Sequence, residues 1–252
     1  MPLLPLHQAH DPRALLRRWR AVAGQTGLKI RTLTEVAGEK ILYLESPPWQ
    51  ENGGTLYLSS GVHGDEAAAA WGLLIWVERN LEVLRKGRFL IFPCLNPHGL
   101  RHNTRTDHRG HDLNRCFHLD DDPVCGPWRQ LIQQQPLRLG LCLHEDYDAQ
   151  GCYVYELGPK ARAMSQRIMQ NAKLRIPADQ RTSIDGSRAQ DGIIRRSTLP
   201  QHLPGMPEAI VLWQLGCAVT LTFETPSEFG FDERVESQVA FIESTLTMLN
   251  QP

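Results

Sequence analysis

Residues 55–66 of this chain read TLYLSSGVHGDE, and the change of pattern within this stretch decides the fold class. Residues 55–60 form an apolar run bounded by a turn at residues 52–54 and by Gly61, as expected of a buried strand. From Glu66 onward the apolar residues recur at helical spacing, at Ala70, Leu73, Leu74, Val77, Leu81 and Leu84. A buried strand that leads through a short turn into a helix is the basic unit of an α/β layer fold.

The same alternation of strand and helix continues along the rest of the chain. Asp11 is expected to cap a first helix that runs from Pro12 toward Ala23. Further strands are expected at residues 28–33, 40–45, 88–95, 139–144 and 218–223, and further helices at 127–135, 158–173, 206–215 and 235–249. Because neither an internal repeat nor a domain boundary is visible, residues 1–252 are expected to form a single domain.

Two long segments fit neither pattern. Residues 96–117 are irregular and rich in His, Arg, Asn, Asp and Gly, and residues 177–207 are polar and interrupted by prolines. Long aperiodic segments inside a globular chain commonly carry function. We therefore expect both segments to lie near a functional site, with the second one wrapping over it.

Composition narrows the class of protein. The chain has a formal net charge of -1 and no basic tract, so nucleic acid and anionic membrane surfaces are excluded as partners. A run of about eighteen apolar residues is absent, so no membrane span is expected. The segment up to Arg20 lacks the apolar core of a signal peptide. A small molecule or a peptide is the expected substrate, and the sequence carries no indication of oligomeric state.

Six cysteines are scattered along the chain without a CxxC pair. Cys94, Cys142 and Cys217 lie within apolar runs, as expected of buried thiols in a reducing cytoplasm. A disulfide between Cys116 and Cys125 remains an alternative. We therefore expect a cytoplasmic protein whose thiols are reduced.

Three of the expected strands lead into side chains that can bind metal or move protons. The strand at 55–60 leads to His63 and Glu66, the strand at 139–144 ends in His144, and the strand at 218–223 leads to Glu224. In open α/β sheets, ligands bind beyond the carboxyl ends of the strands. The sequence therefore predicts one site that these side chains share.

The residue types in this set favour zinc. His63 and Glu66 are three residues apart across a strand-to-helix turn, which lets both side chains reach one point, and His144 is the natural third ligand. Two histidines and one glutamate, with a fourth position left for water, are a known catalytic zinc set. Asp65 competes with Glu66 as a ligand, or holds an imidazole N–H. Glu145 and Asp146 are alternatives beside His144.

Five motifs, taken together, resemble the zinc carboxypeptidase superfamily. In chain order they are GVHGDE (61–66), NPHGLRHNTR (96–105), GHDLNR (110–115), LHE (143–145) and TFETP (222–226). The superfamily includes digestive carboxypeptidases, murein-peptide amidases, and a branch of succinylglutamate desuccinylases and aspartoacylases. The resemblance implies a three-layer α/β/α fold with a mixed, mostly parallel central sheet. It also implies one zinc ion per chain, held by His63, Glu66 and His144.

The resemblance further implies roles for residues around the metal. Glu224 would take a proton from water and pass it to the leaving amine. Arg105 would stabilise the negative charge that develops on the carbonyl oxygen, with Arg101 and Arg109 as alternatives.

Asn114 and Arg115 match the pair that holds the terminal carboxylate of the substrate. A guanidinium group binds a carboxylate through two parallel hydrogen bonds, so the residue types suit this role. The alternative is that Arg115 pairs with Asp112 and braces the loop.

The chain departs from the family pattern at several positions. His98 stands where the family often has Asp, His111 replaces an aliphatic residue, and Cys116 replaces Asn or Asp. The tyrosine that many carboxypeptidases place over the substrate is not identifiable. Its candidates Tyr147, Tyr153 and Tyr155 lie in the wrong part of the chain. A residue from 193–203 is the expected substitute.

The expected function is that of a zinc-dependent metallocarboxypeptidase, which hydrolyses a peptide or amide bond next to a free carboxylate. The alternatives keep the zinc site and change the substrate, to an N-acyl amino acid or to a murein peptide. A non-catalytic peptide-binding module would lack at least one ligand, Glu224 or the arginines. Since all of these are present, an enzyme is expected.

Overall fold

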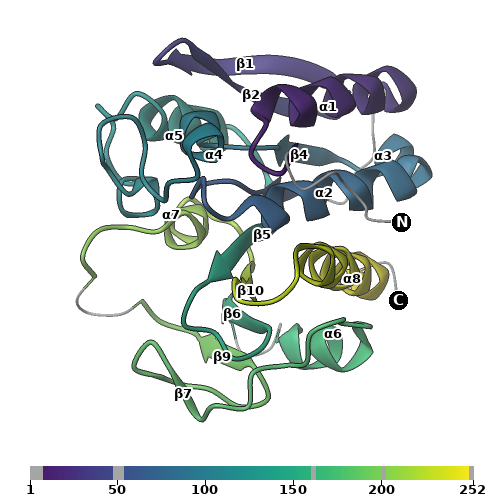
Figure 1. The fold of residues 1–252 in the computed structure, drawn as a ribbon, viewed down its shortest axis with the longest axis vertical. Coiled ribbons are helices and arrows are strands. Elements are labelled where there is room, and N and C mark those ends of the chain that lie inside the picture. The colour runs from purple at the N-terminus through teal and green to yellow at the C-terminus, as the bar shows by residue number, and fades with distance from the viewer. Residues whose placement is uncertain (1–7, 48–53, 160–162, 200–202, 250–252) are drawn as a thin grey trace.

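The computed structural model describes residues 8–47, 54–159, 163–199 and 203–249. Its centre is an eight-stranded sheet with the order β1-β2-β4-β3-β5-β10-β6-β9 (Figure 1). The strands, in that order, are Lys29–Val36, Glu39–Glu45, Phe89–Phe92, Thr55–Ser59, Leu137–Asp146, Thr220–Pro226, Tyr153–Leu157 and Ile193–Arg196. Most of the expected turn at residues 52–54 lies outside the described residues.

The four central strands run in the same direction. β4, β3, β5 and β10 pair in parallel, whereas β2 joins β4 and β6 joins β10 in antiparallel fashion. The carboxyl ends of β3, β5 and β10, which lead to the predicted ligands, are therefore adjacent at one edge of the sheet. This arrangement confirms the expected mixed sheet.

Helices cover both faces of the sheet, which gives the predicted three layers. One face packs against α1 (Pro12–Thr26), α2 (Ala67–Arg79), α6 (Ser165–Asn171) and α8 (Phe231–Leu249). The other face packs against α5 (Cys125–Ile132) and α7 (Glu208–Gln214). Asp11 caps α1 as predicted, since its carboxylate accepts hydrogen bonds from the Arg13 and Ala14 amides.

The helix that follows the first motif differs from the prediction. It breaks at Asn80 into α2 and α3 (Leu81–Lys86), and α2 is buried on all sides rather than along one stripe. A Cβ at Gly72 would lie 2.5 Å from Cβ of Gln238 in α8, so glycine permits this close helix packing. The all-round burial arises because α8, contributed by the other end of the chain, covers the outer face of α2.

Other differences concern short elements. Residues 96–117, expected to be irregular, contain α4 (Pro97–His102) and the 3-10 turn η2 (Leu113–Arg115). The helix expected over 158–173 is confined to α6, and residues 160–162 lie outside the described ranges. The prediction missed β6, β9 and a small hairpin of β7 (Ser183–Ile184) and β8 (Ser187–Arg188).

The structure also bears on the alternative of a disulfide and on the search for membrane-spanning helices. The six cysteines are free thiols, so Cys116 and Cys125 form no disulfide. No helix within the described ranges has the length and apolar character needed to cross a bilayer.

Candidate metal centre and active-site pocket

The floor of a pocket is built by alternate residues of three neighbouring strands. Glu224 of β10 lies opposite His144 of β5 on one side and opposite Tyr153 of β6 on the other. Successive residues of a strand point to opposite faces, so the next row on this face holds Cys142, Thr222 and Tyr155. The pocket has a volume of about 340 Å³ and is lined by both rows.

His63 reaches this floor from the turn that follows β3. The turn packs tightly against α4, because a Cβ at Gly64 would lie 1.8 Å from the carbonyl carbon of Gly99. The Gly64 amide also donates a hydrogen bond to the Thr104 carbonyl oxygen at 3.0 Å. Glycine at this position therefore fixes the path of the turn and the place of His63.

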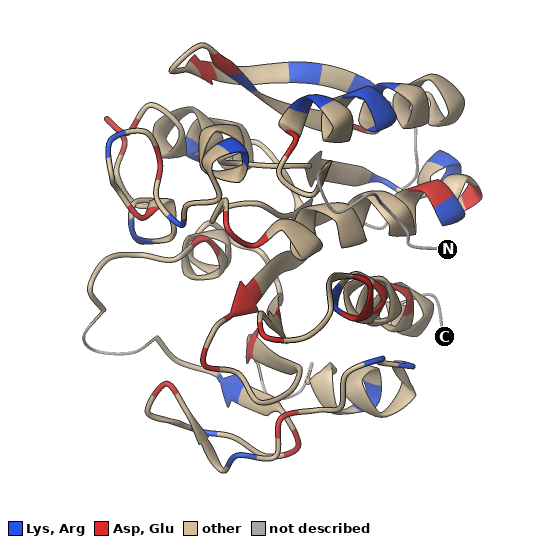
Figure 2. Ribbon diagram, viewed as in Figure 1, with Lys and Arg blue, Asp and Glu red and all other residues tan. Residues whose placement is uncertain are grey.

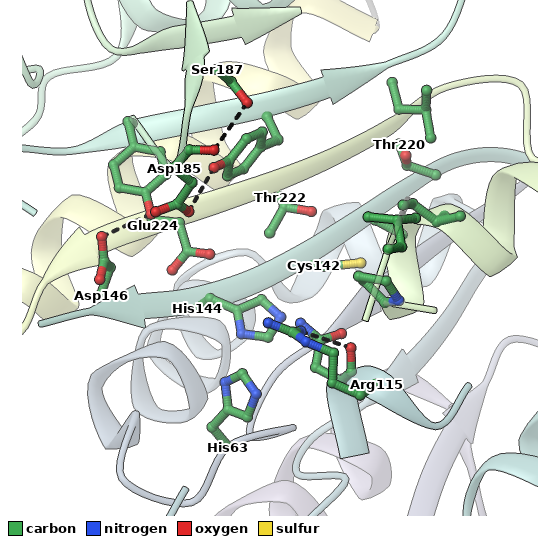
Figure 3. Close-up of a pocket in the computed structure, with 18 of the residues that line it drawn as sticks. His63, Arg115, Cys142, His144, Asp146, Asp185, Ser187, Thr220, Thr222 and Glu224 are labelled. Atoms are coloured by element: carbon green, nitrogen blue, oxygen red, sulfur yellow. Dashed lines mark hydrogen bonds between the residues drawn. The ribbon is translucent and has the colours of Figure 1, made fainter. Parts of the chain in front are cut away.

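His63, Glu66 and His144 converge as the sequence predicted. The Glu66 carboxylate lies between the two imidazoles: one oxygen contacts Nδ1 of His63, and the other lies 2.8 Å from Nδ1 of His144. The two ring centres are 5.2 Å apart, and Figure 3 shows the rings side by side. All three side chains are buried, and their ligand atoms lie within 4.8 Å of one another.

The charges and pKa shifts within the cluster of His63, Glu66 and His144 suit the binding of a cation. Burial opposes the charged forms, but the neighbouring imidazoles lower the pKa of Glu66 to about 2. Burial likewise disfavours the His63 imidazolium, yet the Glu66 charge and a hydrogen bond to Asp112 raise its pKa to about 9. Two imidazoles and a carboxylate buried at one point match the donor set of a three-ligand zinc site.

Asp112 holds His63 from behind. Nε2 of His63 lies 3.0 Å from Oδ1 of Asp112, so a proton on Nε2 leaves Nδ1 free to bind a metal. The Asp112 carboxylate also accepts a hydrogen bond from Nε of Arg105 at 3.1 Å. Although burial opposes ionisation, these contacts lower the pKa of Asp112. From the sequence, Asp112 was expected only as an alternative partner for Arg115, and its contact with His63 was not predicted.

Of the three candidate arginines in this segment, Arg105 is the one beside the metal ligands. Its guanidinium lies 3.7 Å from Oε1 of Glu66. Arg101 is instead paired with Glu39, and Arg109 is paired with both Asp107 and Asp122.

Asn114 and Arg115 both line the pocket, Asn114 contacts the start of α7, and Arg115 is labelled in Figure 3. The Oδ1 atom of Asn114 accepts a hydrogen bond from the backbone amide of Glu208 at 2.9 Å, which directs the amide nitrogen of Asn114 elsewhere. Arg115 donates to the Asn114 carbonyl oxygen at 3.0 Å. Within the described ranges, no carboxylate forms an ion pair with Arg115, so its guanidinium can bind an external anion.

Glu224 faces the pocket from β10 and is partly accessible (Figure 3). Desolvation raises the pKa of its carboxyl well above the ordinary value, and the negative charges of Glu66 and Asp146 raise it further, although His144 opposes them. A carboxyl with a raised pKa both accepts and releases protons more readily near neutral pH than an ordinary glutamate.

Glu145, Asp146 and Asp65, the other candidate ligands, lie outside the cluster of His63, Glu66 and His144. Glu145 points to the opposite face of the sheet, where it accepts from the Ala68 amide at the start of α2 and pairs with Arg234. Asp146 accepts a hydrogen bond from the Tyr153 hydroxyl at 2.9 Å. Asp65 leaves one carboxylate oxygen buried without a partner among the described residues, and it lies outside the ligand cluster.

The side of the pocket away from the proposed metal ligands, called the far wall below, is formed by strands that were not predicted from the sequence. It consists of Tyr153, Tyr155, Asp185, Ser187 and Arg196. The Tyr155 hydroxyl donates to Asp185 at the tip of the β7–β8 hairpin, and Arg196 of β9 donates to Ser187. Figure 2 shows basic residues on β9 and acidic residues at the end of β5.

The positions of Tyr153 and Tyr155 in the far wall differ from the sequence-based expectation. Tyr153 and Tyr155 lie in the pocket because β6 pairs directly with β10. The alternation of residues 153–157, YVYEL, was the available signal for this strand. Tyr147 is exposed and does not line the pocket. Of the segment expected to cover the substrate, Arg196 and Leu203 line the pocket, while residues 200–202 lie outside the described ranges.

Known proteins show the same fold. A protein named "putative metallopeptidase" from Shewanella amazonensis matches with a TM-score of 0.83 and 22% identity, over 96% of this chain and 94% of that chain. One from Shewanella denitrificans matches with a TM-score of 0.81 and 24% identity, over 95% and 91%. A metallo-carboxypeptidase from Pseudomonas aeruginosa, in complex with (2-guanidinoethylmercapto)succinic acid, matches with a TM-score of 0.63 and 20% identity, over 92% and 68%. A search of curated proteins found no significant match.

These likenesses show the fold of the chain. In sequence, residues 52–138 match the family model of the succinylglutamate desuccinylase/aspartoacylase catalytic domain. The matched part contains His63, Glu66 and the segment from Arg105 to Arg115, and it ends before His144 and Glu224.

Proposed function

We propose that this protein is a zinc-dependent hydrolase of the carboxypeptidase kind, which cleaves a peptide or amide bond next to a free carboxylate. The observation that carries the proposal is the position of Glu224. It lies opposite His144 in the sheet register, in the same pocket as His63, Glu66 and Arg115. A proton-transfer group, a metal-ligand trio and an unpaired arginine thus share one pocket.

The chemistry proposed for the centre combines a metal with a base. A bound zinc ion supplies Lewis acidity, which polarises a carbonyl group and makes water easier to deprotonate. Glu224 takes the proton of the attacking water and delivers it to the leaving nitrogen. Arg105, beside Glu66, stabilises the negative charge that develops on the carbonyl oxygen. One such zinc ion per chain is expected.

The substrate carboxylate is proposed to bind at Arg115 and Asn114. Arg115 is partly exposed to the pocket and offers a guanidinium, while Asn114 keeps its amide nitrogen free because its oxygen is bound by the Glu208 amide. A guanidinium binds a carboxylate through two parallel hydrogen bonds and the amide nitrogen adds a further donor, which would fix the scissile bond over the metal trio. The charge of Arg115 also helps to lower the pKa of Asp112, but the two side chains form no direct ion pair in the described residues.

A second candidate function is deacylation of an N-acyl amino acid, the activity named in the matched family model. Arg196 is the specific observation that favours it. The only hydrogen bond that its side chain makes in the described residues goes to Ser187, and no carboxylate in those residues forms an ion pair with it. An arginine at the far wall suits a leaving residue that carries a second carboxylate. Murein-peptide amidase activity remains a further alternative with the same site.

The test combines metal content with substrate cleavage. Purified protein is assayed for zinc and then incubated with a peptide library, its C-terminally amidated copy, and N-acyl aspartate and N-acyl glutamate. Chelator-sensitive release of C-terminal residues from the free-acid library, but not from the amidated one, supports a carboxypeptidase. Release of acid from the N-acyl amino acids alone supports the second candidate. Cleavage that persists without metal would contradict both.

A further inference from the structure

A second group of histidines lies outside the pocket. His98 and His102 are four residues apart in α4, and their ring centres are 4.4 Å apart. The ring of His108, from the loop that follows, has its centre 6.0 Å from that of His98. These residues lie in the motif segment where His98 departs from the family pattern, and the proposed function uses none of them. From this arrangement, we propose that His98, His102 and His108 form a second binding site for a divalent transition-metal ion of the Zn²⁺, Ni²⁺ or Cu²⁺ kind.

The spacing of the first two rings suits chelation. Residues four apart on a helix face the same side, so two imidazoles at this spacing can bind one ion. With metal–nitrogen distances of about 2.0–2.1 Å, two imidazoles on one ion place their ring centres roughly 4.5–5 Å apart. The separation of 4.4 Å between His98 and His102 is close to that range, as is the 5.2 Å between His63 and His144. The exposed side chain of His108 must rotate to complete the set, because its ring centre lies 6.0 Å from that of His98.

The surroundings of His98 also point to a ligand. Its Nδ1 atom is buried and has no hydrogen-bond partner among the described residues. A cavity of about 10 Å³, close to the space that one water occupies, is lined by His98 and His108 and also by Asp107 and Glu39, whereas His102 does not line it. This cavity shares no lining residue with the 340 Å³ pocket, so the two sites are separate.

The surroundings of His98 favour its neutral form, which is compatible with metal binding. Burial lowers the pKa of His98, and the neighbouring His102 and His108 lower it further. A neutral imidazole is the form that binds a metal. The nearby carboxylates already have cationic partners, because Asp107 is bound by Arg109 and Glu39 by Arg101. The imidazoles, rather than these carboxylates, therefore supply the ligands, and they favour a transition metal over Mg²⁺ or Ca²⁺.

An ion bound by these three histidines would affect the loop that carries Arg105 and Asp112. Arg105 lies between His102 and His108 in the chain, and Asp112 follows shortly after. An ion held by all three histidines would join α4 to the far end of this loop and restrict its motion. The site is open to solvent at His102 and His108, so it is expected to bind more weakly than the buried trio.

The test is a calorimetric titration of chelator-treated, full-length protein with Zn²⁺ and, separately, with Ni²⁺. The wild type is expected to bind two ions per chain. The His98→Gln/His102→Gln variant is expected to lose the weaker site, with its affinity reduced at least about tenfold, and to keep the tighter one. The control variant His111→Gln/His118→Gln, which changes two exposed histidines outside the cluster, should bind two ions.

A second set of variants separates this proposal from the proposed function. His144→Ala should retain the weaker site, and zinc bound to it should show imidazole ligands by X-ray absorption. Zinc should also slow amide hydrogen exchange of residues 103–110 in this variant. A wild type that binds one ion, or a second ion that survives the His98→Gln/His102→Gln change, would overturn the proposal. Neither result would affect the expected role of His63, Glu66 and His144.

Discussion

The side of the pocket that carries the metal ligands, here called the metal wall, and the far wall are held in different ways. In the metal wall (His63, Glu66, His144, Arg105 and Asp112), the three proposed ligands are buried and each contacts another member, whereas Arg105 is exposed. In the far wall, Tyr153 is buried and donates to Asp146, whereas Tyr155 and Arg196 depend on contacts with the exposed hairpin, at Asp185 and Ser187. Preorganised groups are the ones that accelerate chemistry, whereas peripheral groups select substrates. We therefore expect changes in the metal wall to affect turnover or metal binding, and changes in the far wall to affect selectivity.

The largest effect is expected at Glu224, which lies between the two walls. Glu224→Gln should lower kcat about 10²–10⁴-fold while zinc content stays the same, because the amide cannot accept the proton of water. Steady-state kinetics together with metal analysis would measure both quantities. Glu228→Gln, an exposed glutamate in the following turn, is the matched control. A Glu224→Gln enzyme with normal turnover would remove this residue from the mechanism.

Substitution of Asp112 tests whether its contact with His63 contributes to zinc binding. Asp112→Ala removes the acceptor for Nε2 of His63 and should weaken zinc binding about 10–100-fold. Competition with a chromogenic chelator would give the affinity. Asp120→Asn, which alters an exposed aspartate of the same loop, should leave the affinity unchanged. Equal zinc affinity in the wild type and in Asp112→Ala would mean that His63 is oriented by other contacts.

Arg196 tests the far wall. Arg196→Gln should lower kcat/KM about tenfold for substrates with an acidic leaving residue and leave those with a neutral residue unaffected, since one charge-assisted hydrogen bond is lost. Arg188→Gln, an exposed arginine of the neighbouring hairpin, is the control. An equal loss on acidic and neutral substrates would indicate that Arg196 supports the hairpin rather than the substrate.

The smallest effect is expected behind the metal wall, at Glu208. This buried carboxyl accepts hydrogen bonds from Tyr57 and Ser59, and burial raises its pKa above the ordinary 4.5. Between those two pKa values the folded chain holds a proton that the unfolded chain has lost, so stability falls as pH rises through this window. Glu208→Gln should remove that dependence, because the amide does not titrate. Denaturant unfolding of both proteins at several pH values would show the two curves converge below pH 4.5.

The metal wall could be predicted from the sequence because each of its ligands is encoded locally. His63 and Glu66 belong to one strand-turn-helix unit, and His144 ends an apolar strand, so a reader of the sequence can place each beside the end of a strand. The parallel arrangement of β3, β5 and β10 then brings them together. By contrast, the contact between His63 and Asp112 spans 49 residues and has no local signature.

What the sequence indicated by itself was the class of fold, the candidate ligand trio, the candidate base Glu224, and the segment that carries Arg105, Asn114 and Arg115. These depend on short-range patterns: apolar periodicity, turn chemistry and motif order. The tertiary structure alone decided that β6 lies against β10, that Tyr153 and Tyr155 enter the pocket, and that α2 is buried on every side. The reason is physical, because strand register and helix packing join residues far apart in the chain, and the energy of those contacts is not written in either partner's local sequence.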